Sequence, residues 1–409
     1  MHPHRPVLIH NHRPAATVLA VAFLTLAASG GVRAQTTGTP NTVQDILGFL
    51  VLNRLVGTED FDKDVQAAEA TRDTLTRALL ASVATMPVSS SSGGFNYRLN
   101  PGLGTVERAS DTFGPLYLER ALTSGAGRAS FGFTFQYASF RSLDGNDLRS
   151  GDFITVANQF TNETAPFDVE RLQLDISSRT ATLFGTIGLG DRVDVGTAIP
   201  LVRLRITGSR INDYRGESFV PATATAETTG FADIVLRTKV RLTPTASAFA
   251  VAAGAEARLP TGREEDLLGA GELAMRFLGI ASYEMSRTGL YGNVIVGTGG
   301  LGHELAYGGG VTFAPALRLT LVAELMLRQI AGLQAITPVV APHPRIAGVR
   351  TTRLVPGGED VTTGFSAFGF KWNVGSRWLV HTHVVLPVSN NGLTTRITPA
   401  FAVDYSFGK

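Results

Sequence analysis

Three glycines, Gly297, Gly299 and Gly302, have the spacing of the dinucleotide-binding fingerprint and follow an apolar stretch. That fingerprint needs a helix directly after the glycines, because the helix N-terminus holds the pyrophosphate. Here the chain continues through Leu305 and Tyr307 with the alternation of a strand. The pattern therefore predicts a glycine-rich loop between strands and no nucleotide site.

Other signals of reaction chemistry are weak. The Gly-x-Ser-x-Gly elbow of serine hydrolases does not occur in the sequence. Cysteine is also absent, which removes disulfides, thiolate catalysis and Cys-ligated zinc. His381 and His383 share one face of a strand, but no third metal ligand can be assigned to them, so polar wall residues are favoured over a metal site. We expect a protein that is not an enzyme and holds no cofactor or metal.

Charged side chains alternate with apolar ones in several segments, which places them on one face of a strand. Leu236 and Val240, for example, face one way while Arg237 and Lys239 face the other. Cross-strand ion pairs filling a narrow interior, or an unbalanced subset selecting solutes by charge, both fit this pattern. The predicted interior residues are Asp233, Arg237, Lys239, Arg241, Glu256, Arg258, Glu272, Arg276, Glu284, Glu324, Arg328, Lys371, His381, His383 and Asp404.

The elements that carry these residues keep a period of two from about Arg128 to Phe407. Segments of roughly ten residues or more exceed the usual strands of a soluble sandwich and match the hydrocarbon thickness of a bilayer. The sequence predicts an all-β fold, a transmembrane antiparallel β-barrel of about twelve strands. These start near Arg128, Asp168, Val193, Gly230, Ser247, Gly271, Gly289, Leu305, Leu319, Val361, Trp378 and Thr395.

Short turns and long connections alternate along this layout, as in barrels with short periplasmic turns and long external loops. Gly208 to Thr229 and Ala331 to Asp360 are predicted to be external loops. An even strand count places both ends of the mature chain on the periplasmic side. Residues 93–127 remain open between an extra hairpin, which would make fourteen strands, and a segment lying in the lumen.

Aromatic residues gather near the predicted periplasmic ends of the last strands, where we expect a girdle at the membrane interface. They are Phe368, Phe370, Trp372, Trp378, Tyr405 and Phe407. The last strand resembles the C-terminal strand that the barrel-assembly machinery reads, although Gly408 and Lys409 follow its final aromatic. The expected partners are therefore outer-membrane lipid, this machinery and a small-molecule solute.

The first residues read as a secretory signal, with an apolar core from Ala15 to Ala28 and cleavage predicted before Gln35. Helical spacing follows from Asn41 to about Met86, where Thr42 and Asp45 suggest a capped start. The predicted units are a signal peptide (1–34), a helical segment with its linker (35–92), the hairpin or lumenal segment (93–127) and the barrel (128–409).

The composition fits an exported barrel. Only 17% of residues are charged, the formal net charge is +2, and basic residues do not cluster, which argues against nucleic acid as a partner. The 44% of hydrophobic residues nowhere form a mature stretch long enough for a membrane helix. We therefore expect the mature protein in the outer membrane of a Gram-negative-type envelope.

Three stretches, taken in order, resemble the outer-membrane proteins of the phenol-degradation MetA-pathway family. They are Gly190 to Gly196 leading to Ile199-Pro200, then Leu259 to Gly262, then Leu268 to Gly271. The resemblance covers about Asp168 to Phe407 and implies uptake of small, including hydrophobic or aromatic, molecules. With the signal peptide, the alternation and the order of short and long connections, it leads us to predict an outer-membrane channel or uptake barrel that works by passive diffusion. The alternative is a non-conducting structural or surface-binding barrel that acts through its long external loops.

Overall fold

The computed structural model describes residues 36–38, 42–52, 64–84, 88–90, 94, 97–100, 105–108, 110–375 and 377–407. The predicted signal peptide, residues 1–34, and its cleavage point before Gln35 lie outside these residues. Within the described part of the chain, no helix combines the length and apolar character needed to span a bilayer.

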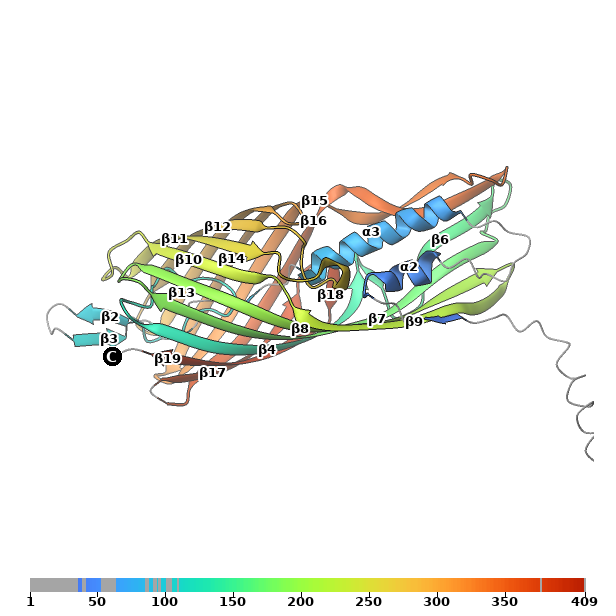
Figure 1. The fold of residues 1–409 in the computed structure, drawn as a ribbon. Coiled ribbons are helices and arrows are strands. Elements are labelled where there is room, and N and C mark those ends of the chain that lie inside the picture. The colour runs from blue at the N-terminus through green and yellow to red at the C-terminus, as the bar shows by residue number, and fades with distance from the viewer. Residues whose placement is uncertain are drawn as a thin grey trace, which may run out of the picture.

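Twelve antiparallel strands of the described chain close into a barrel (Figure 1). They are β4 (Ala129–Leu143), β7 (Asp168–Gly188), β8 (Val193–Tyr214), β10 (Ile234–Arg241), β11 (Phe249–Leu259), β12 (Ala274–Glu284), β13 (Thr288–Gly299), β14 (His303–Ala316), β15 (Leu319–Pro342), β16 (Val349–Asn373), β17 (Trp378–Pro387) and β19 (Thr398–Phe407). Each pairs with the next of them, and β19 pairs with β4 to close the ring. The predicted barrel of twelve strands is confirmed.

The alternative of fourteen strands is wrong. Residues 97–100 and 105–108 form β2 (Tyr97–Asn100) and β3 (Thr105–Arg108), which pair with each other in a separate two-stranded sheet. This hairpin projects beyond the barrel at the end that carries the C-terminus (Figure 1).

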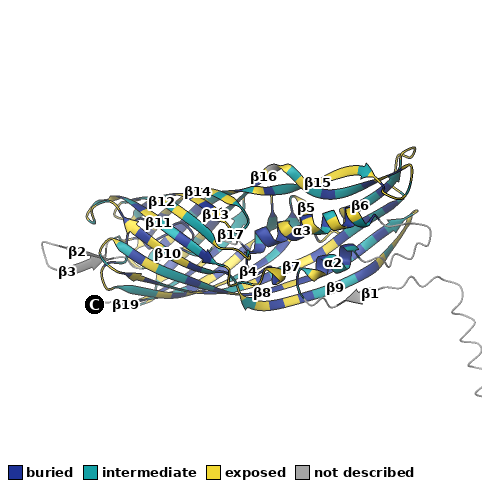
Figure 2. Cartoon of the chain, turned by 45° about the horizontal axis from the view of Figure 1, so that its top comes forward, coloured by how far each residue is buried: buried dark blue, intermediate teal, exposed yellow. Residues whose placement is uncertain are grey.

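The barrel wall has one apolar face and one polar face, as the period of two predicts. On β4, Phe131 and Phe135 are exposed at 58% and 40%, whereas Thr134 between them is buried. The same alternation of exposed and buried residues runs along the other wall strands (Figure 2). Because large apolar side chains cover the outside, the surface matches a lipid environment, and the polar side chains face inward.

The two ends of the barrel differ. The short-turn end carries the turns at residues 189–192, 242–248, 285–287 and 317–318, the connection between β16 and β17, and the end of β19. The opposite end continues as an extension formed by the outer parts of β7, β8, β15 and β16, with β6 (Phe153–Phe160) and β9 (Glu217–Phe231) between or beside them. Short strands β5 (Asn146–Asp147) and β18 (Leu393–Thr395) pair with β4 near its end.

The long external loops predicted at 208–229 and 331–360 are therefore wrong, because most of these residues are strand. β8 and β9 form a hairpin whose tight turn uses positive φ angles of 50° at Arg215 and 86° at Gly216. β15 and β16 likewise pair up to Pro342 and Arg350. Cross-strand pairing satisfies the backbone hydrogen bonds that loops would leave to water.

Two prolines within strands lie where the pairing pattern changes. Pro200 falls at the point where β8 changes its pairing partner. Residues up to Ala198 pair with β10, and residues from Leu201 onward pair with β9. Pro399 is the second residue of β19. Both positions agree with the expectation that proline, which lacks an N–H donor, occurs at irregularities or strand ends.

Two helices, α2 (Asp45–Leu52) and α3 (Val65–Ala84), lie inside the extension (Figure 1). The start of α2 is capped as predicted: Thr42 Oγ1 accepts the Asp45 N–H and Asp45 Oδ2 accepts the Thr42 N–H, both at 3.2 Å. Its buried residues Ile46, Leu47 and Leu50 pack with apolar side chains of the extension.

We expected the helical segment at the same end of the barrel as the C-terminus, and its placement in the extension corrects this expectation. The inner face of the extension carries Leu174, Leu204 and Ile206, each at most 1% exposed beneath the helices. Covering such a face removes apolar area from water, at about 25 cal/mol per Å². The helices are therefore part of the core of the extension.

We expect Leu50→Asp to release α2 from the extension while the barrel stays folded. Leu50 is fully buried, so truncating it would cost about 2–5 kcal/mol, and a buried carboxylate without a partner costs more. Limited proteolysis of the reconstituted protein should then cut within residues 42–52. Leu52→Asp, at a partly exposed position of the same helix, is the control, and equal cleavage of both variants would contradict this packing role.

Candidate functional site: the barrel lumen

Nearly all of the predicted interior residues are buried or half-buried at the inner wall. They are Asp233, Arg237, Lys239, Arg241, Glu256, Arg258, Arg276, Glu284, Glu324, Arg328, Lys371, His381, His383 and Asp404. Glu272 was also predicted to face the interior, and this prediction is wrong. It is exposed in the loop before β12, because pairing on that strand begins only at Ala274.

The six predicted girdle aromatics lie on the outer face, near the short-turn end. Five are between 42% and 51% exposed, namely Phe368, Phe370, Trp372, Trp378 and Phe407. Tyr405 lies between two of them, with its ring centroid 4.7 Å from that of Trp378 and 4.6 Å from that of Phe407. Trp378, Tyr405 and Phe407 thus form one continuous aromatic surface at this end.

Residues 110–124, here called the plug, run through the short-turn half of the lumen and are anchored to the wall by buried polar side chains. The carboxylate of Glu324 accepts the backbone N–H groups of Leu116, Tyr117 (2.9 Å) and Leu118 (3.1 Å). Lys371 Nζ donates to the Pro115 carbonyl at 2.8 Å. These wall charges satisfy the buried backbone of a segment without regular structure.

Other parts of the wall bind the plug in the same manner. Lys239 Nζ donates to the carbonyls of Arg120 (3.1 Å) and Leu122 (3.0 Å). The side-chain amide of Asn293 accepts the Glu119 N–H at 2.7 Å and donates to the Glu119 carbonyl at 2.8 Å. The charged interior therefore serves in part to hold a lumenal segment.

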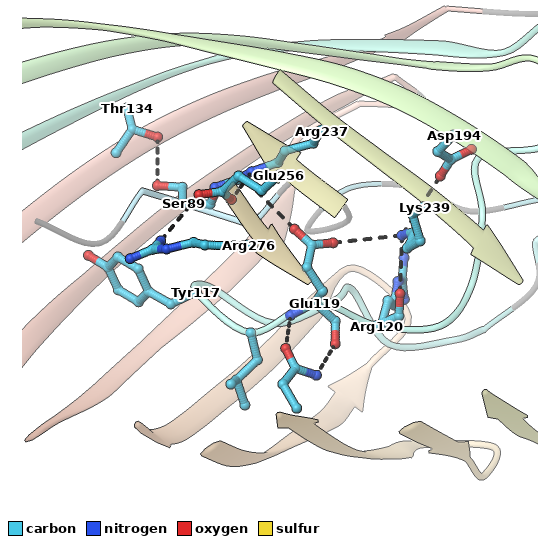
Figure 3. A network of polar contacts seen from close by, with 12 residues as sticks. Ser89, Tyr117, Glu119, Arg120, Thr134, Asp194, Arg237, Lys239, Glu256 and Arg276 are labelled. Atoms are coloured by element: carbon cyan, nitrogen blue, oxygen red, sulfur yellow. Dashed lines mark hydrogen bonds and ion pairs between the residues drawn. The ribbon is translucent and has the colours of Figure 1, made fainter. Parts of the chain in front are cut away.

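Next to the plug, four side chains of alternating charge form a row across the wall (Figure 3), here called the belt: Arg237, Glu256, Arg276 and Glu304. Glu256 accepts from Arg237 Nε at 2.9 Å and from Arg276 Nη1 at 3.2 Å. Arg276 Nη2 also donates to Glu304 at 2.6 Å. β13 lies between the strands of Arg276 and Glu304 and carries Gly297 at this level, where a Cβ would lie 3.2 Å from both side chains. The glycine thus leaves room for the arginine to reach across β13.

The belt borders a chamber inside the barrel, whose empty space of about 1280 Å³ includes solvent that is open to it. Tyr117 and Glu119 of the plug line it, and Ser82 at the end of α3 lines it as well. Apolar side chains that also line it include Phe140, Leu278, Ile295, Met326, Phe365, Val385 and Leu393. The chamber is therefore amphipathic, with a charged belt and an extensive apolar surface.

A buried aromatic and histidine cluster joins the plug to β17. Tyr117 Oη lies 3.0 Å from His383 Nε2, and the rings of His381 and His383 are stacked 5.7 Å apart. His381 Nε2 lies 3.7 Å from Asp404 Oδ2. Burial, with the negative charge of Glu324 nearby, raises the pKa of the Tyr117 phenol well above its usual range. Tyr117 therefore remains neutral and able to donate a hydrogen bond.

Sequence reasoning missed Tyr117, Glu119, Asn293 and Glu304. The plug has no periodicity that would mark its residues as lumenal. Asn293 is on the inner face of a predicted strand but is uncharged, and Glu304 lies just before the predicted start at Leu305. Starting the predicted strand at His303 would have included Glu304. Counting side-chain amides among the inward polar residues would have included Asn293.

A closed antiparallel wall with an apolar outside and a charged inside defines a transmembrane β-barrel of the outer-membrane type. Searches with protein-family models found no match, and none was found among curated proteins.

Solved barrels show similarity at low sequence identity. An outer membrane channel from Pseudomonas putida F1 is 11% identical, with a TM-score of 0.45 over 70% of this chain and 98% of the channel. The transport unit of the autotransporter AIDA-I from Escherichia coli is 10% identical, with a TM-score of 0.38 over 68% of this chain and 90% of that one. OprB of Pseudomonas putida is 12% identical, with a TM-score of 0.27 over 69% and 93%.

Proposed function

We propose that this chain is an outer-membrane channel or uptake barrel for small, neutral and partly apolar molecules, including aromatic ones, which it passes by passive diffusion. The observation that carries the proposal is the amphipathic chamber enclosed by the barrel wall. Ligand sites are characteristically concave and mostly apolar, with a few polar groups that orient the ligand. The resemblance to the MetA-pathway family agrees with this class of solute.

The charges around the chamber argue for a neutral solute. Among the described residues that line it are three arginines (Arg237, Arg276, Arg328) and three glutamates (Glu119, Glu256, Glu304). Since neither sign is in excess, the lining offers no net field that would concentrate anions or cations. The belt provides hydrogen-bond donors and acceptors, while the apolar surface accommodates a hydrocarbon or aromatic group.

The proposal includes the location and assembly of the protein. The exposed apolar face would contact outer-membrane lipid, and the six outward aromatics would lie at the membrane interface on the short-turn side. That side is then periplasmic. β19, with Phe407 near its end, would be the strand that the barrel-assembly machinery recognises after export and removal of the signal peptide.

Filling the chamber with a larger side chain should reduce the flux of solute through the barrel. Met326 lines the chamber, whereas its neighbour Leu325 is 45% exposed on the outer face. We expect Met326→Trp to reduce the flux of phenyl glucoside, a neutral aromatic solute that crosses lipid poorly, by about tenfold in proteoliposomes. Leu325→Trp, the same change on the other face, should leave flux unchanged. Wild-type flux equal to that of protein-free liposomes would overturn the transport function.

A second candidate is a non-conducting, surface-binding barrel, favoured by one observation. α2 and α3 occupy the extension while the plug occupies the short-turn half, so chain segments fill much of the interior. Truncating the β15–β16 hairpin beyond residues 334 and 358 separates the candidates. Lost surface binding, with no flux through either the truncated or the intact protein, would support the second function. Altered flux with normal binding would support the first.

A further inference from the structure

A second cavity lies beside the plug, along β7, β8, β10, β11 and β12. It is narrow, with about 20 Å³ in which the centre of a water molecule fits, and is lined partly by small side chains, including Thr186, Gly196, Gly254 and Ala255. Glu119, Arg237, Glu256 and Leu278 line both this cavity and the chamber. The two spaces therefore adjoin, and the shared side chains form the boundary between them.

The other side of the plug is packed differently. Leu116 and Tyr117 pack against Val322 and Ala367, and Glu324 binds three successive backbone N–H groups there. A solute that leaves the chamber on this side would have to break these contacts. The side of β10 to β12 is the easier route, because small side chains leave space along it.

Glu119 is the plug side chain at the boundary between the two cavities, and it lies between two cations (Figure 3). Its carboxylate is 3.7 Å from Arg237 Nη1 and 3.7 Å from Lys239 Nζ. Both cations have closer partners. Arg237 donates to Glu256 at 2.9 Å and to the Ser89 carbonyl at 2.7 Å, and Lys239 donates to two plug carbonyls. These bonds of the two cations do not involve the Glu119 side chain.

We propose that Glu119 is the gate and the specificity-determining residue of a passage that leads from the chamber through the second cavity toward the short-turn end. This rests on the proposed function of the barrel. The carboxylate closes the passage. With Asp194 and Glu256 against Arg237 and Lys239, it gives the described lining of the second cavity one formal negative charge in excess, which disfavours anions. A small neutral solute passes when the side chain rotates away. Without the carboxylate, the lining carries two formal charges of each sign and no longer repels anions.

The natural absence of cysteine provides a direct test of the route. Gly254→Cys places a thiol in the second cavity, where an added Cβ has neighbours no closer than 3.4 Å. Ala367→Cys places one against the packed side of the plug. We expect a small membrane-impermeant thiosulfonate, added to folded protein in liposomes, to label the first thiol at least about tenfold faster than the second, as mass spectrometry would show. Unfolded protein should show equal labelling of both variants.

Removing the charge tests the gate. In planar bilayers, Glu119→Gln should raise the chloride-to-potassium permeability ratio about fivefold or more, while Glu163→Gln, on an exposed connection, should match wild type. An unchanged ratio in Glu119→Gln, or faster labelling at residue 367 than at 254, would overturn the inference. Labelling at 254 without solute flux in wild type would support the passage and reject the proposed transport function, so the two failures are distinguishable.

Discussion

Replacing Glu324 with alanine is expected to release the plug and raise the conductance of the reconstituted barrel. In the folded protein its carboxylate accepts three successive backbone N–H groups, from Leu116, Tyr117 and Leu118. Leaving a buried donor without a partner costs about 1–3 kcal/mol. Leaving three donors without their partner at once therefore costs about 3 kcal/mol or more, which shifts the equilibrium toward a displaced plug by about a hundredfold.

Single-channel recordings should show this as frequent large openings that wild type rarely makes. Glu324→Gln should have an intermediate effect, because its amide oxygen keeps one acceptor. The matched control is Glu304→Ala, which removes a lumenal carboxylate bonded to Arg276 on the wall. If Glu324→Ala were as quiet as wild type, or if Glu304→Ala opened equally often, the anchoring of the plug by this carboxylate would be refuted.

The second large effect is expected from arginine on the lipid-facing surface. Val294 is 52% exposed near the middle of β13, within the barrel wall. Val340 is 56% exposed near the far end of β15, in the extension. Arginine at the bilayer midplane costs a transmembrane barrel about 2–4 kcal/mol, and near or beyond the interface about 0–1 kcal/mol. Val294→Arg should therefore lower the free energy of unfolding by that larger amount.

Reversible urea unfolding in lipid vesicles would measure the difference, with Val340→Arg as the control of equal chemistry and similar exposure. We expect the control to lie within about 1 kcal/mol of wild type. Equal losses in both variants would mean that β13 does not face hydrocarbon at Val294. The short-turn end would then have to be placed relative to the membrane in another way.

Much of the wall could be predicted because apolar and polar side chains alternate along a barrel strand. The alternation around Phe131 and around Arg237 depends only on neighbouring residues, since side chains on a strand point to opposite faces in turn. The observed starts of β7, β8 and β17 match the predicted Asp168, Val193 and Trp378. Length then separated a membrane barrel from a soluble sandwich, because segments of this kind match the hydrocarbon thickness.

The predictions failed where a contact between distant residues decides the structure. Polar and small residues between 208 and 229 suggested a loop, yet β8 and β9 pair across the turn at Gly216. Glu272 shares the parity of Arg276, but the strand begins after it. The position of α2 depends on the apolar inner face of the extension, which is formed from several strands far apart in the sequence.

The sequence by itself determined the barrel, its twelve strands and which side chains face inward, because each of these follows from local alternation and the even spacing of turns. Only the tertiary structure decided what the inward charges do. Glu324 and Lys239 anchor the plug, Arg237, Glu256, Arg276 and Glu304 form a balanced belt, and Glu119 separates the two cavities. These roles depend on the register between strands and on the path of residues 110–124. Local periodicity cannot specify either. The path of the plug is set by contacts between residues more than a hundred positions apart, and the belt by the pairing of separate strands.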